Sequence, residues 1–578
     1  MKTRNTAKTA QNGSFRVYRV YAGAVNFNRD FNIDRLKTEE FDVLVIGGGI
    51  TGVGVALDAA SRGLRTALVE KDDFSSGTSS KSSKLIHGGL RYLQQGEIGL
   101  VYEALHERQR LRKNAPHLVQ LLPFMIPILT KDGVVSRKIA RALGSALWMY
   151  DLTGGWRIGK FHRRLKAKAA HAHLPTMPVE KLASAYLYYD AAADDSRLCV
   201  TIARTASQYG AAIANQCAVT EIVHDEQGVA RGAIVQPTGG EPFTIRATTV
   251  VNAAGVWADN IRQADEGQHP RSIRPAKGIH ITVPWKKVQN DIAIVIPVRR
   301  DKRSLFVVPW ISNGDGTYQY TYIGTTDTDF AGGVDESQTS AEDIDYVLEA
   351  LNQSITTNVT VDDVTAVWSG LRPLVSNDDG TAAKGKTADL SRKHKVKVSP
   401  SGVISIMGGK LTTYRKMSEH TVDEVVKHTG KASTCKTKNL AFIGADGFKA
   451  SMLKGADAHL AERFGTELNA IKELIAENPS LGDPLIVGLP YLRAEAVFAC
   501  RNEMAQTLDD VLSRRTRARI VNRRATLASA RKVAELMATE LNWSASEIDR
   551  QVAAFVDSCS REEAAGLVSE AEFLASVQ

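Results

Sequence analysis

The sequence predicts a mixed α/β and α+β protein with two or three domains. A chain of 578 residues is too long for a single hydrophobic core. A strand, a glycine-rich turn, a helix and a second strand follow one another between residues 42 and 70, as in a parallel α/β sheet. Residues 272–330 are rich in strands, and the pattern from about residue 440 onward is mostly helical.

The first predicted strand, 43–46, leads into the turn Gly47-Gly48-Gly49-Ile50-Thr51-Gly52. This turn matches GxGxxG. In that pattern the first glycine permits the turn, the second lets the backbone approach a pyrophosphate, and the third lets the next helix pack closely. The helix predicted at 53–62 would direct its N-terminal N–H groups at the phosphates. A glycine-rich turn alone is often structural, but the ordered elements around this one predict a Rossmann-like dinucleotide site.

The second strand, 65–69, ends at Glu70, about twenty residues beyond the glycines. A carboxylate at this spacing accepts hydrogen bonds from a ribose hydroxyl. An acid rather than a basic residue disfavours NADP. The turn and its acid do not distinguish NAD from FAD.

A hydroxyl-rich loop, 75–83, follows and leads into His87-Gly88-Gly89-Leu90-Arg91-Tyr92. The glycines would let the backbone approach a flat ring. His87 is the side chain best suited to exchange a proton near neutral pH. Arg91 is a bidentate donor for phosphate or carboxylate. A single histidine is more often structural than catalytic, so both interpretations of His87 stay open.

Two further segments place cations beside glycines or apolar residues. Arg372 lies in the apolar run Gly-Leu-Arg-Pro-Leu, where an unpaired guanidinium would be costly. Its partner is either a bound anion or a protein carboxylate. Lys410 follows Gly408-Gly409 after a predicted buried strand at 403–407. Because this strand comes after the strand-rich block, the nucleotide-binding domain is predicted to be discontinuous.

The formal net charge of +9 indicates an anionic partner, although no nucleic-acid motif accompanies it. Basic residues are concentrated between residues 137 and 168, interleaved with Trp148, Tyr150, Trp156 and Phe161. This combination suits the headgroup layer of a membrane, or else a solvated basic helix pair. A second basic run, 514–524, is more typical of a structural helix with ion pairs.

Nothing in the sequence indicates a metal site, a disulfide framework, a signal peptide or a membrane-spanning segment. The five cysteines are scattered, which fits a reducing compartment. The most apolar stretch, 118–129, is too short to span a bilayer. Residues 1–39 are predicted to be a poorly ordered polar extension, with a mitochondrial presequence as the alternative.

Six segments together closely resemble the FAD-dependent, aerobic-type, membrane-associated glycerol-3-phosphate dehydrogenases of the D-amino-acid-oxidase-like flavoprotein superfamily. They are DVLVIGGGITG, DDFSSGTSSKSSKLIHGGLRYL, VVNAAGVWAD, SGLRPL, SRKH and IMGGKLTTYRKM. The resemblance extends over the chain from about residue 40. The segment YLRAEAVFACRNEMAQTLDDVLSRRTRA resembles the family's helical cap domain.

The resemblance implies a discontinuous FAD-binding domain, a substrate domain built on an antiparallel sheet, and a helical C-terminal domain. The first comprises 40–115, 190–270 and 400–430, the second comprises 116–189 and 271–399, and the third comprises 431–578. The implied FAD contacts are Gly47, Gly49, Ile50, Thr51, Gly52, Glu70, Lys71, Thr78, Ser79, Ser80, Ser83, Lys84, Leu85, His87, Gly88, Gly89, Val219, Ala254, Gly255, Asp259, Gly409, Lys410, Leu411 and Thr412.

The resemblance also implies a substrate site for sn-glycerol 3-phosphate, formed by Arg91, Tyr92, Arg372, Arg392, Lys410 and Thr412. A phosphate monoester is close to a dianion at neutral pH and needs several cations. The hypothesis for the reaction is hydride transfer from C2 to flavin N5, which yields dihydroxyacetone phosphate. His87 would be the base, and Arg372 would stabilise the developing oxygen charge.

Electrons are expected to pass to the quinone pool at an anionic membrane surface. The chain has no large insertion between Asp291 and Arg372 of the kind that related oxidases carry, and no DxDxDG calcium motif. A bacterial-type enzyme is therefore expected, cytoplasmic and peripherally bound to the inner face of the cell membrane, with a homodimer possible. The alternatives are a glycerol-3-phosphate oxidase that uses oxygen, or an amine or amino-acid oxidase on the same fold.

Overall fold

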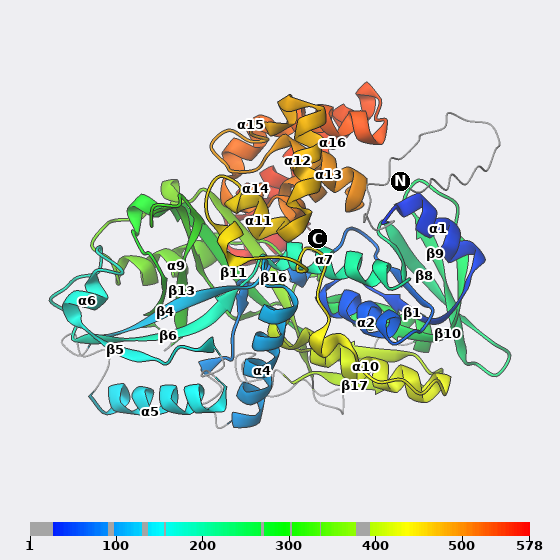
Figure 1. Ribbon diagram of the computed structural model, residues 1–578, viewed down its shortest axis with the longest axis horizontal. Helices are drawn as coiled ribbons and strands as arrows, with labels where there is room; N and C mark the ends of the chain where they lie inside the picture. Colours follow the sequence, from blue (N-terminus) through cyan, green and yellow to red (C-terminus); the bar gives the residue numbers. More distant parts are fainter. Residues whose placement is uncertain are drawn as a thin grey trace.

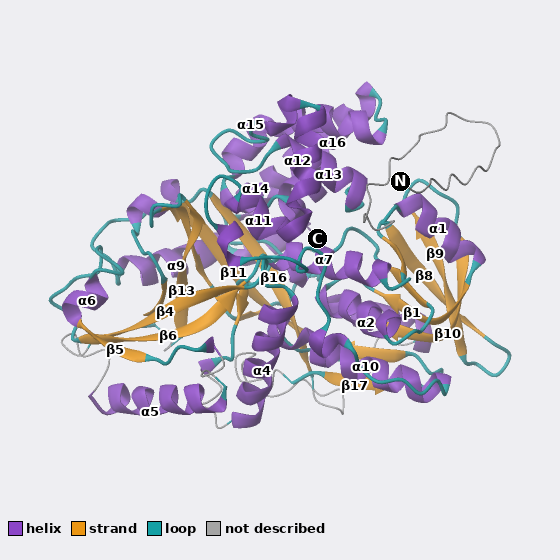
Figure 2. Ribbon diagram, in the orientation of Figure 1, coloured by secondary structure: helices purple, strands orange, loops and turns teal. Residues whose placement is uncertain are grey.

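Two β-sheets and a helical C-terminal region make up the protein in this computed structural model (Figures 1 and 2). The structure describes residues 27–90, 97–129, 137–154, 158–267, 271–300, 303–335, 337–376 and 393–577. This arrangement confirms the predicted fold class.

The first sheet has the order β17-β18-β10-β1-β2-β7, with the hairpin of β8 (Cys217–His224) and β9 (Ala230–Pro237) beside β10. Its parallel part joins distant segments. β1 (Glu40–Ile46) lies between β2 (Thr66–Val69) and β10 (Phe243–Asn252), and β10 also pairs with β18 (Ile404–Met407). β7 (Ala212–Ala214) extends the sheet from β2, and β17 (Lys395–Val398) pairs antiparallel with β18. β1 is buried on both faces beyond its first residue, which explains its unbroken apolar run.

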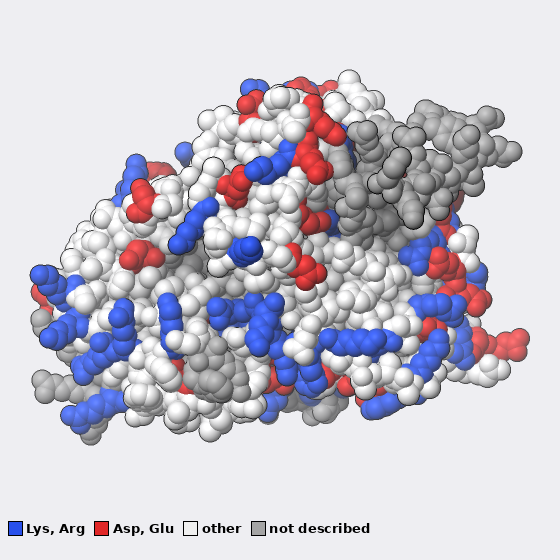
Figure 3. Space-filling view, in the orientation of Figure 1, with Lys and Arg blue, Asp and Glu red and all other residues white. Residues whose placement is uncertain are grey.

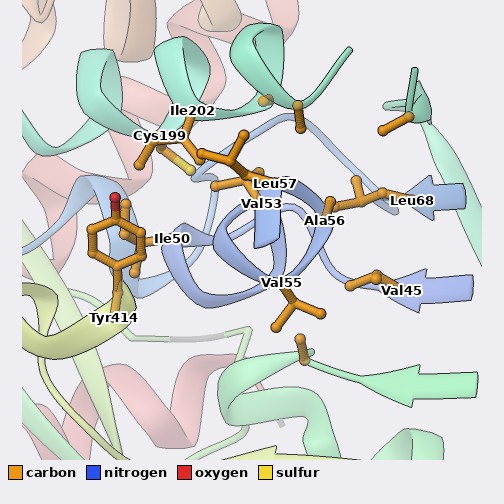
Figure 4. Close-up of a cluster of buried hydrophobic side chains, with 14 of the residues drawn as sticks. Val45, Ile50, Val53, Val55, Ala56, Leu57, Leu68, Cys199, Ile202 and Tyr414 are labelled. Carbon is orange, nitrogen blue, oxygen red and sulfur yellow. The ribbon is translucent and has the colours of Figure 1, made fainter. Parts of the chain in front are cut away.

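Helix α2 (Ile50–Ser61) follows the glycine turn and lies between α7 (Asp195–Gln208) and α10 (Tyr414–Thr429) (Figure 1). Its side chains meet those of the sheet in one buried cluster. Figure 4 shows Val53 and Leu57 of α2 near Ile202 of α7, with Leu68 and Val45 reaching in from β2 and β1. This packing fixes the start of α2 relative to the strand ends.

The prediction of a poorly ordered N-terminal extension is wrong for residues 29–38. Helix α1 (Arg29–Thr38) begins at the N-cap Asn28, whose side chain accepts a hydrogen bond from Phe31 N. Leu36 is fully buried and belongs to a cluster with Phe41 and Leu44 of β1. The polar composition of this segment hid a helix that buries only a narrow apolar stripe.

The second sheet has the order β15-β11-β14-β13-β12-β4-β6-β3. Its long strands are β4 (Gln120–Ile128), β6 (Ser184–Ala192), β11 (Ile273–Pro284), β13 (Ser304–Ser312), β14 (Tyr318–Gly324) and β16 (Ala366–Val375). The short ones are β3 (Leu85–Ile86), β5 (Arg163–Lys166), β12 (Ala293–Pro297) and β15 (Thr328–Asp329). The pairing is antiparallel, as predicted, except that β12 pairs parallel with β4. β6 runs through the predicted domain limit at residue 190, because this strand has to pair with β4 along its whole length.

Helices beside this sheet or its connections include α4 (Ile98–Asn114), α5 (Arg137–Thr153), α6 (Ala167–His171) and α9 (Ala341–Asn352). The C-terminal region is helical and lies above both sheets in Figure 1. Its main helices are α11 (Ala458–Phe464), α12 (Leu468–Glu477), α13 (Arg493–Asn502), α14 (Ala518–Val521), α15 (Arg523–Leu541), α16 (Ala545–Ala565) and α17 (Glu570–Val577). Among the described residues, no helix is long and apolar enough to cross a membrane.

The contact between α2 and α10 depends on Gly54 and gives a stability prediction. A methyl group at Gly54 would lie 2.8 Å from Tyr414 Cδ2 and closer still to Ser418 Oγ. We expect Gly54→Ala to lower the free energy of unfolding by about 1–3 kcal/mol through overpacking. Gly99 of α4 has open space around the same position. Gly99→Ala should therefore gain up to about 1 kcal/mol of helix propensity. Thermal unfolding of both variants tests this, and a Gly54→Ala protein as stable as Gly99→Ala would contradict it.

Candidate functional site

A cavity lies at the carboxyl ends of β1, β2, β10 and β18, and we call it the nucleotide cavity. Residues from several distant segments line it: Gly47, Gly49, Ile50, Thr51, Glu70, Lys71, Ser76, Gly77, Thr78, Ser79, Val219, Ala254, Gly255, Trp257, Asp335, Gly408, Gly409, Lys410, Leu411 and Met417, among others. Fourteen of the 24 residues predicted to contact FAD line this cavity.

The glycine turn has the geometry that its sequence predicts. Gly47 has a φ of +112°, a conformation that only glycine adopts without strain. A side chain on Gly52 would overlap the Gly47 carbonyl oxygen, so α2 starts directly against the turn. Ile50 N donates to Ser79 Oγ over 2.9 Å, which brings the hydroxyl-rich loop to the helix N-terminus. The first N–H groups of α2 and the hydroxyls of this loop thus form a cradle for phosphate.

Glu70 is buried and held by the backbone on both carboxylate oxygens. Oε2 accepts from Gly48 N over 2.6 Å, and Oε1 accepts from Asp72 N over 2.9 Å. Burial raises the pKa of its carboxyl to about 7, and the backbone donors oppose that shift. A carboxylate offers about four acceptor positions. The two bonds therefore leave capacity for the hydroxyls of a ribose in the cavity.

Trp257 and Asp335 also line the nucleotide cavity, and neither was predicted from the sequence. Trp257 Nε1 donates to Asp335 Oδ1 over 2.9 Å, and Lys71 Nζ lies 4.2 Å from the Trp257 ring centroid. Trp257 stands three residues after Ala254, whose backbone was predicted to contact the cofactor. Its aromatic ring in that segment was the available signal.

A second cavity, which we call the basic cavity, adjoins the first. Its lining is Thr78, Lys81, Ser82, Ser83, Leu85, His87, Gly278, His280, Thr325, Gly370, Arg372, Pro373, Leu374, Gly409, Lys410, Leu411 and Thr412. The two cavities share Thr78, Pro373, Gly409, Lys410 and Leu411. A ligand in the basic cavity would therefore lie next to one end of a ligand in the nucleotide cavity.

Arg372 reaches the basic cavity from β16 and has a protein carboxylate as a neighbour. Its Nη1 lies 3.3 Å from Asp327 Oδ1, and its Nη2 donates to Thr325 Oγ1 over 2.9 Å. Of the two partners that the sequence left open, the structure supplies the carboxylate. Gly278 gives the guanidinium its space, because a Cβ there would lie 2.7 Å from Arg372 Cζ. These contacts fix the orientation of the side chain at the cavity wall.

His87 and Thr412 are brought together from positions 325 residues apart. His87 N donates to Thr412 Oγ1 over 3.1 Å, and Thr412 Oγ1 lies 3.2 Å from the His87 carbonyl oxygen. The next amide, Gly88 N, donates to Tyr150 OH over 2.9 Å. The backbone around His87 is thus held on both sides, with the histidine in the cavity lining.

His280 lines the basic cavity but was missed by sequence reasoning. Its Nε2 lies 2.8 Å from Ser83 Oγ, and its ring stacks on Trp368 at 4.7 Å between centroids. Burial, with Lys84 and Arg372 nearby, holds its pKa well below the usual range, so the ring is neutral at pH 7. The one available signal was a histidine inside an otherwise apolar strand.

Some predicted residues line neither cavity, and three others fall outside the described residues. Arg91, Tyr92 and Arg392 fall outside the described residues. Six predicted cofactor residues line neither cavity: Gly52, Ser80, Lys84, Gly88, Gly89 and Asp259. Lys84 is buried and pairs with Asp195 at 3.4 Å. Asp259 accepts from Ile273 N over 3.0 Å and so joins α8 (Ala258–Glu266) to β11. The side chains of Lys84 and Asp259 are therefore occupied by structural contacts.

Comparison with known proteins agrees with this geometry. Residues 42–415 match the family model described as FAD dependent oxidoreductase, and residues 435–548 match that of the C-terminal domain of alpha-glycerophosphate oxidase. The chain is 38% identical over 536 residues to glycerol-3-phosphate dehydrogenase 2 of Mycobacterium tuberculosis, covering 90% of this chain and 88% of that protein. It is 37% identical over 537 residues to the human mitochondrial glycerol-3-phosphate dehydrogenase, covering 88% of this chain and 71% of that protein.

A solved structure covers nearly the same length. The glycerol-3-phosphate dehydrogenase of Bacillus halodurans, complexed with FAD, superimposes with a TM-score of 0.72 at 29% identity and covers 92% of this chain and 96% of its own. The match extends over the nucleotide-binding sheet, the second sheet and the helical C-terminal region together. The chain therefore belongs to the FAD-dependent oxidoreductases and, among them, to the glycerol-3-phosphate dehydrogenase family.

Proposed function

We propose that the chain binds FAD in the nucleotide cavity and oxidises sn-glycerol 3-phosphate to dihydroxyacetone phosphate in the basic cavity. The observation that carries this proposal is the shared wall of Thr78, Pro373, Gly409, Lys410 and Leu411. It would bring a small anionic substrate next to one end of a bound dinucleotide. The phosphate cradle and the spare acceptor capacity of Glu70 fit that dinucleotide. When bound, FAD supplies an acceptor for two electrons.

The basic cavity suits a phosphate monoester because its lining holds cations and hydroxyl donors. Such a monoester carries close to two negative charges at neutral pH. Lys410 supplies a compact charge and Thr412 a hydroxyl, both on the segment that also lines the nucleotide cavity. Arg372, oriented by Asp327 and Thr325, stabilises negative charge as it develops on the C2 oxygen of the substrate.

The C2 hydroxyl must lose a proton as the alcohol becomes a ketone. We assign His87 as the base that accepts this proton, because an imidazole exchanges protons near neutral pH. Its backbone is held by Thr412, so the base and the phosphate-binding segment keep a fixed separation. His280 lines the same cavity, but its depressed pKa makes it a poorer base.

The first test is the rate of flavin reduction by glycerol 3-phosphate without oxygen, followed by stopped-flow absorbance. We expect His87→Gln to slow it about 100-fold or more, through loss of the base. Arg372→Ala should slow it by a similar factor, through loss of charge stabilisation. A near-normal rate in either variant would remove that residue from its role.

A matched pair of glycine variants tests the orientation of Arg372 without removing it. Gly278→Ala would push a methyl group against the guanidinium, whereas Gly99→Ala adds one to open space. The first should slow flavin reduction and the second should leave it unchanged.

We further propose a quinone as the electron acceptor, in line with the family resemblance and the dehydrogenase relatives. The alpha-glycerophosphate oxidase name of the C-terminal family model makes oxygen the principal alternative. Turnover of glycerol 3-phosphate should be faster with a water-soluble quinone analogue than with dissolved oxygen. Faster turnover with oxygen would identify an oxidase, and flavin bleaching by glycine but not by glycerol 3-phosphate would identify an amino-acid oxidase.

A membrane surface is the proposed place of this electron transfer, and α5 is the contact. Leu147 and Tyr150 of this helix are buried, whereas Trp148 and Leu152 are 56% and 69% exposed. The nearby strand β5 and the residues around it expose further cations and one aromatic ring: Lys160, Phe161, Arg163, Arg164, Lys166 and Lys168. Figure 3 shows basic side chains gathered along the lower edge of one face, the side on which Figure 1 places α5. Exposed apolar groups beside cations suit an anionic bilayer.

Vesicle sedimentation tests this surface. Binding to vesicles of anionic phospholipid should exceed binding to neutral ones and should weaken with salt. The double variant Trp148→Ser, Leu152→Ser should lose most of it, while Val487→Ser, which changes an 84% exposed valine of the C-terminal region, should not. Equal binding by all three proteins would assign α5 to the solvated surface instead.

A further inference from the structure

One loop, residues 73–84, connects the two cavities, and we call it the linking loop. Ser76, Gly77, Thr78 and Ser79 line the nucleotide cavity, and Lys81, Ser82 and Ser83 line the basic cavity, with Thr78 in both. Its regular structure is limited to the 3-10 helix η1 (Thr78–Ser80) and the turns on either side. The loop therefore depends on outside contacts for its position.

The first of these contacts holds the end near the nucleotide cavity. Asp73 is fully buried, and its two oxygens accept from Arg515 Nη1 and Nη2 over 2.7 and 2.8 Å. Arg514 Nε donates to the same carboxylate over 2.6 Å. Both arginines come from the π-helix Asp510–Arg515 of the C-terminal region, more than 440 residues away. A bidentate guanidinium fixes both the distance and the angle of its partner.

The second contact holds the end near the basic cavity. Arg517 is 2% exposed, donates to the Ser80 carbonyl oxygen and lies 3.1 Å from Asp195 Oδ1. The other oxygen of Asp195 accepts from Ser82 N over 3.1 Å and from Ser82 Oγ over 2.7 Å. Lys84 Nζ lies 3.4 Å from this carboxylate. One buried carboxylate thus joins the C-terminal arginine to the cavity-lining Ser82.

The conformation of Arg517 itself depends on these contacts. Its φ is +65°, a left-handed conformation that is costly for a residue with a side chain. Such strain persists only where surrounding contacts impose it, and it is commonly associated with function. The π-helix Asp510–Arg515 ends two residues before Arg517. A π-helix is a rare form, and where it occurs it is often at a functional site. Two unusual backbone features therefore coincide with the arginines that reach the linking loop.

We propose that the C-terminal region positions the linking loop through two sets of contacts, one for each cavity. We call each set an arm and the two together the clamp. Arg514 and Arg515 are positioning residues for the nucleotide cavity, and Arg517 is a positioning residue for the basic cavity. The proposal deepens the proposed function and rests on it for the identities of the two ligands. It assigns to the helical region a direct part in forming the site, in addition to covering the two sheets.

Two lysine variants in the FAD-loaded full-length protein separate the arms, because lysine keeps the charge but loses the fork of the guanidinium. For Arg515→Lys we expect FAD to dissociate about tenfold faster, with little change in KM for glycerol 3-phosphate, as for the loss of one charge-assisted hydrogen bond. For Arg517→Lys we expect KM to rise by about the same factor while FAD dissociation stays near that of the parent. FAD release is followed by the rise of flavin fluorescence.

The control is Arg531→Lys, in the same region, whose side chain is 57% exposed and pairs with Asp549 at the surface. It should match the parent in both measurements. The clamp is overturned if both buried variants also match the parent, or if each changes FAD release and KM by the same factor, as general loosening would.

If Arg517→Lys fails to fold, Ser82→Ala tests the same arm. It removes the Ser82 hydroxyl that donates to Asp195, and Ser82 is only partly buried. It should raise KM without faster FAD release.

The two levels of the proposal fail in different ways. A parent protein that holds FAD but does not oxidise glycerol 3-phosphate would refute the proposed function. The rate of FAD release, measured without substrate, would still test whether Arg514 and Arg515 position the loop at the nucleotide cavity. Unchanged FAD release in Arg515→Lys alongside normal oxidation by the parent would refute that arm alone.

Discussion

The parallel alignment of β1, β2, β10 and β18 is the constraint on which the site depends. In parallel strands the carboxyl ends meet at one edge of the sheet, where ligands of open α/β sheets bind. This alignment brings the glycine turn, Glu70, Ala254 and Gly408 to one cavity, although they are separated by up to 361 positions in the sequence. The second sheet contributes Arg372 and His280 from strands β16 and β11, which are directly paired. The basic cavity forms where these side chains lie beside Gly409, Lys410 and Leu411, which follow β18.

Much of the nucleotide cavity could be predicted because its determinants are local. The glycine turn and Glu70 lie within one βαβ unit, so spacing along the chain fixes their positions in space. Thr412 and His87 are different, because their contact depends on long-range packing, and only the family resemblance linked them. Asp327 has no local signature. His280 and Trp257 have weak ones, an isolated histidine in an apolar strand and an aromatic residue near Ala254, whose meaning became evident only once the strands were paired.

Charge pairing in the fold shows which groups the basic residues of the sequence contact. Arg372 was expected to need an anion, and the fold provides one in Asp327, so this guanidinium is oriented before a substrate arrives. Lys84 was predicted to contact a cofactor, and its buried side chain pairs with Asp195. The basic run 514–524 was predicted to carry ion pairs, and Arg514, Arg515, Arg519 and Arg523 do so. A basic residue in the sequence indicates a charge to be balanced, and only the fold identifies the group that balances it.

Buried ion pairs are weak evidence for stability, because desolvation offsets most of their attraction. The arginines around Asp73 and Asp195 are therefore better understood through geometry than through stability. An apolar interface would bury the same surface without fixing the carbonyl of Ser80 or the carboxylate of Asp73 in one orientation. A loop that must serve two ligands at once needs both ends fixed, and bidentate guanidinium groups provide directional contacts that apolar packing lacks. The buried charges between the C-terminal region and the linking loop follow from this requirement.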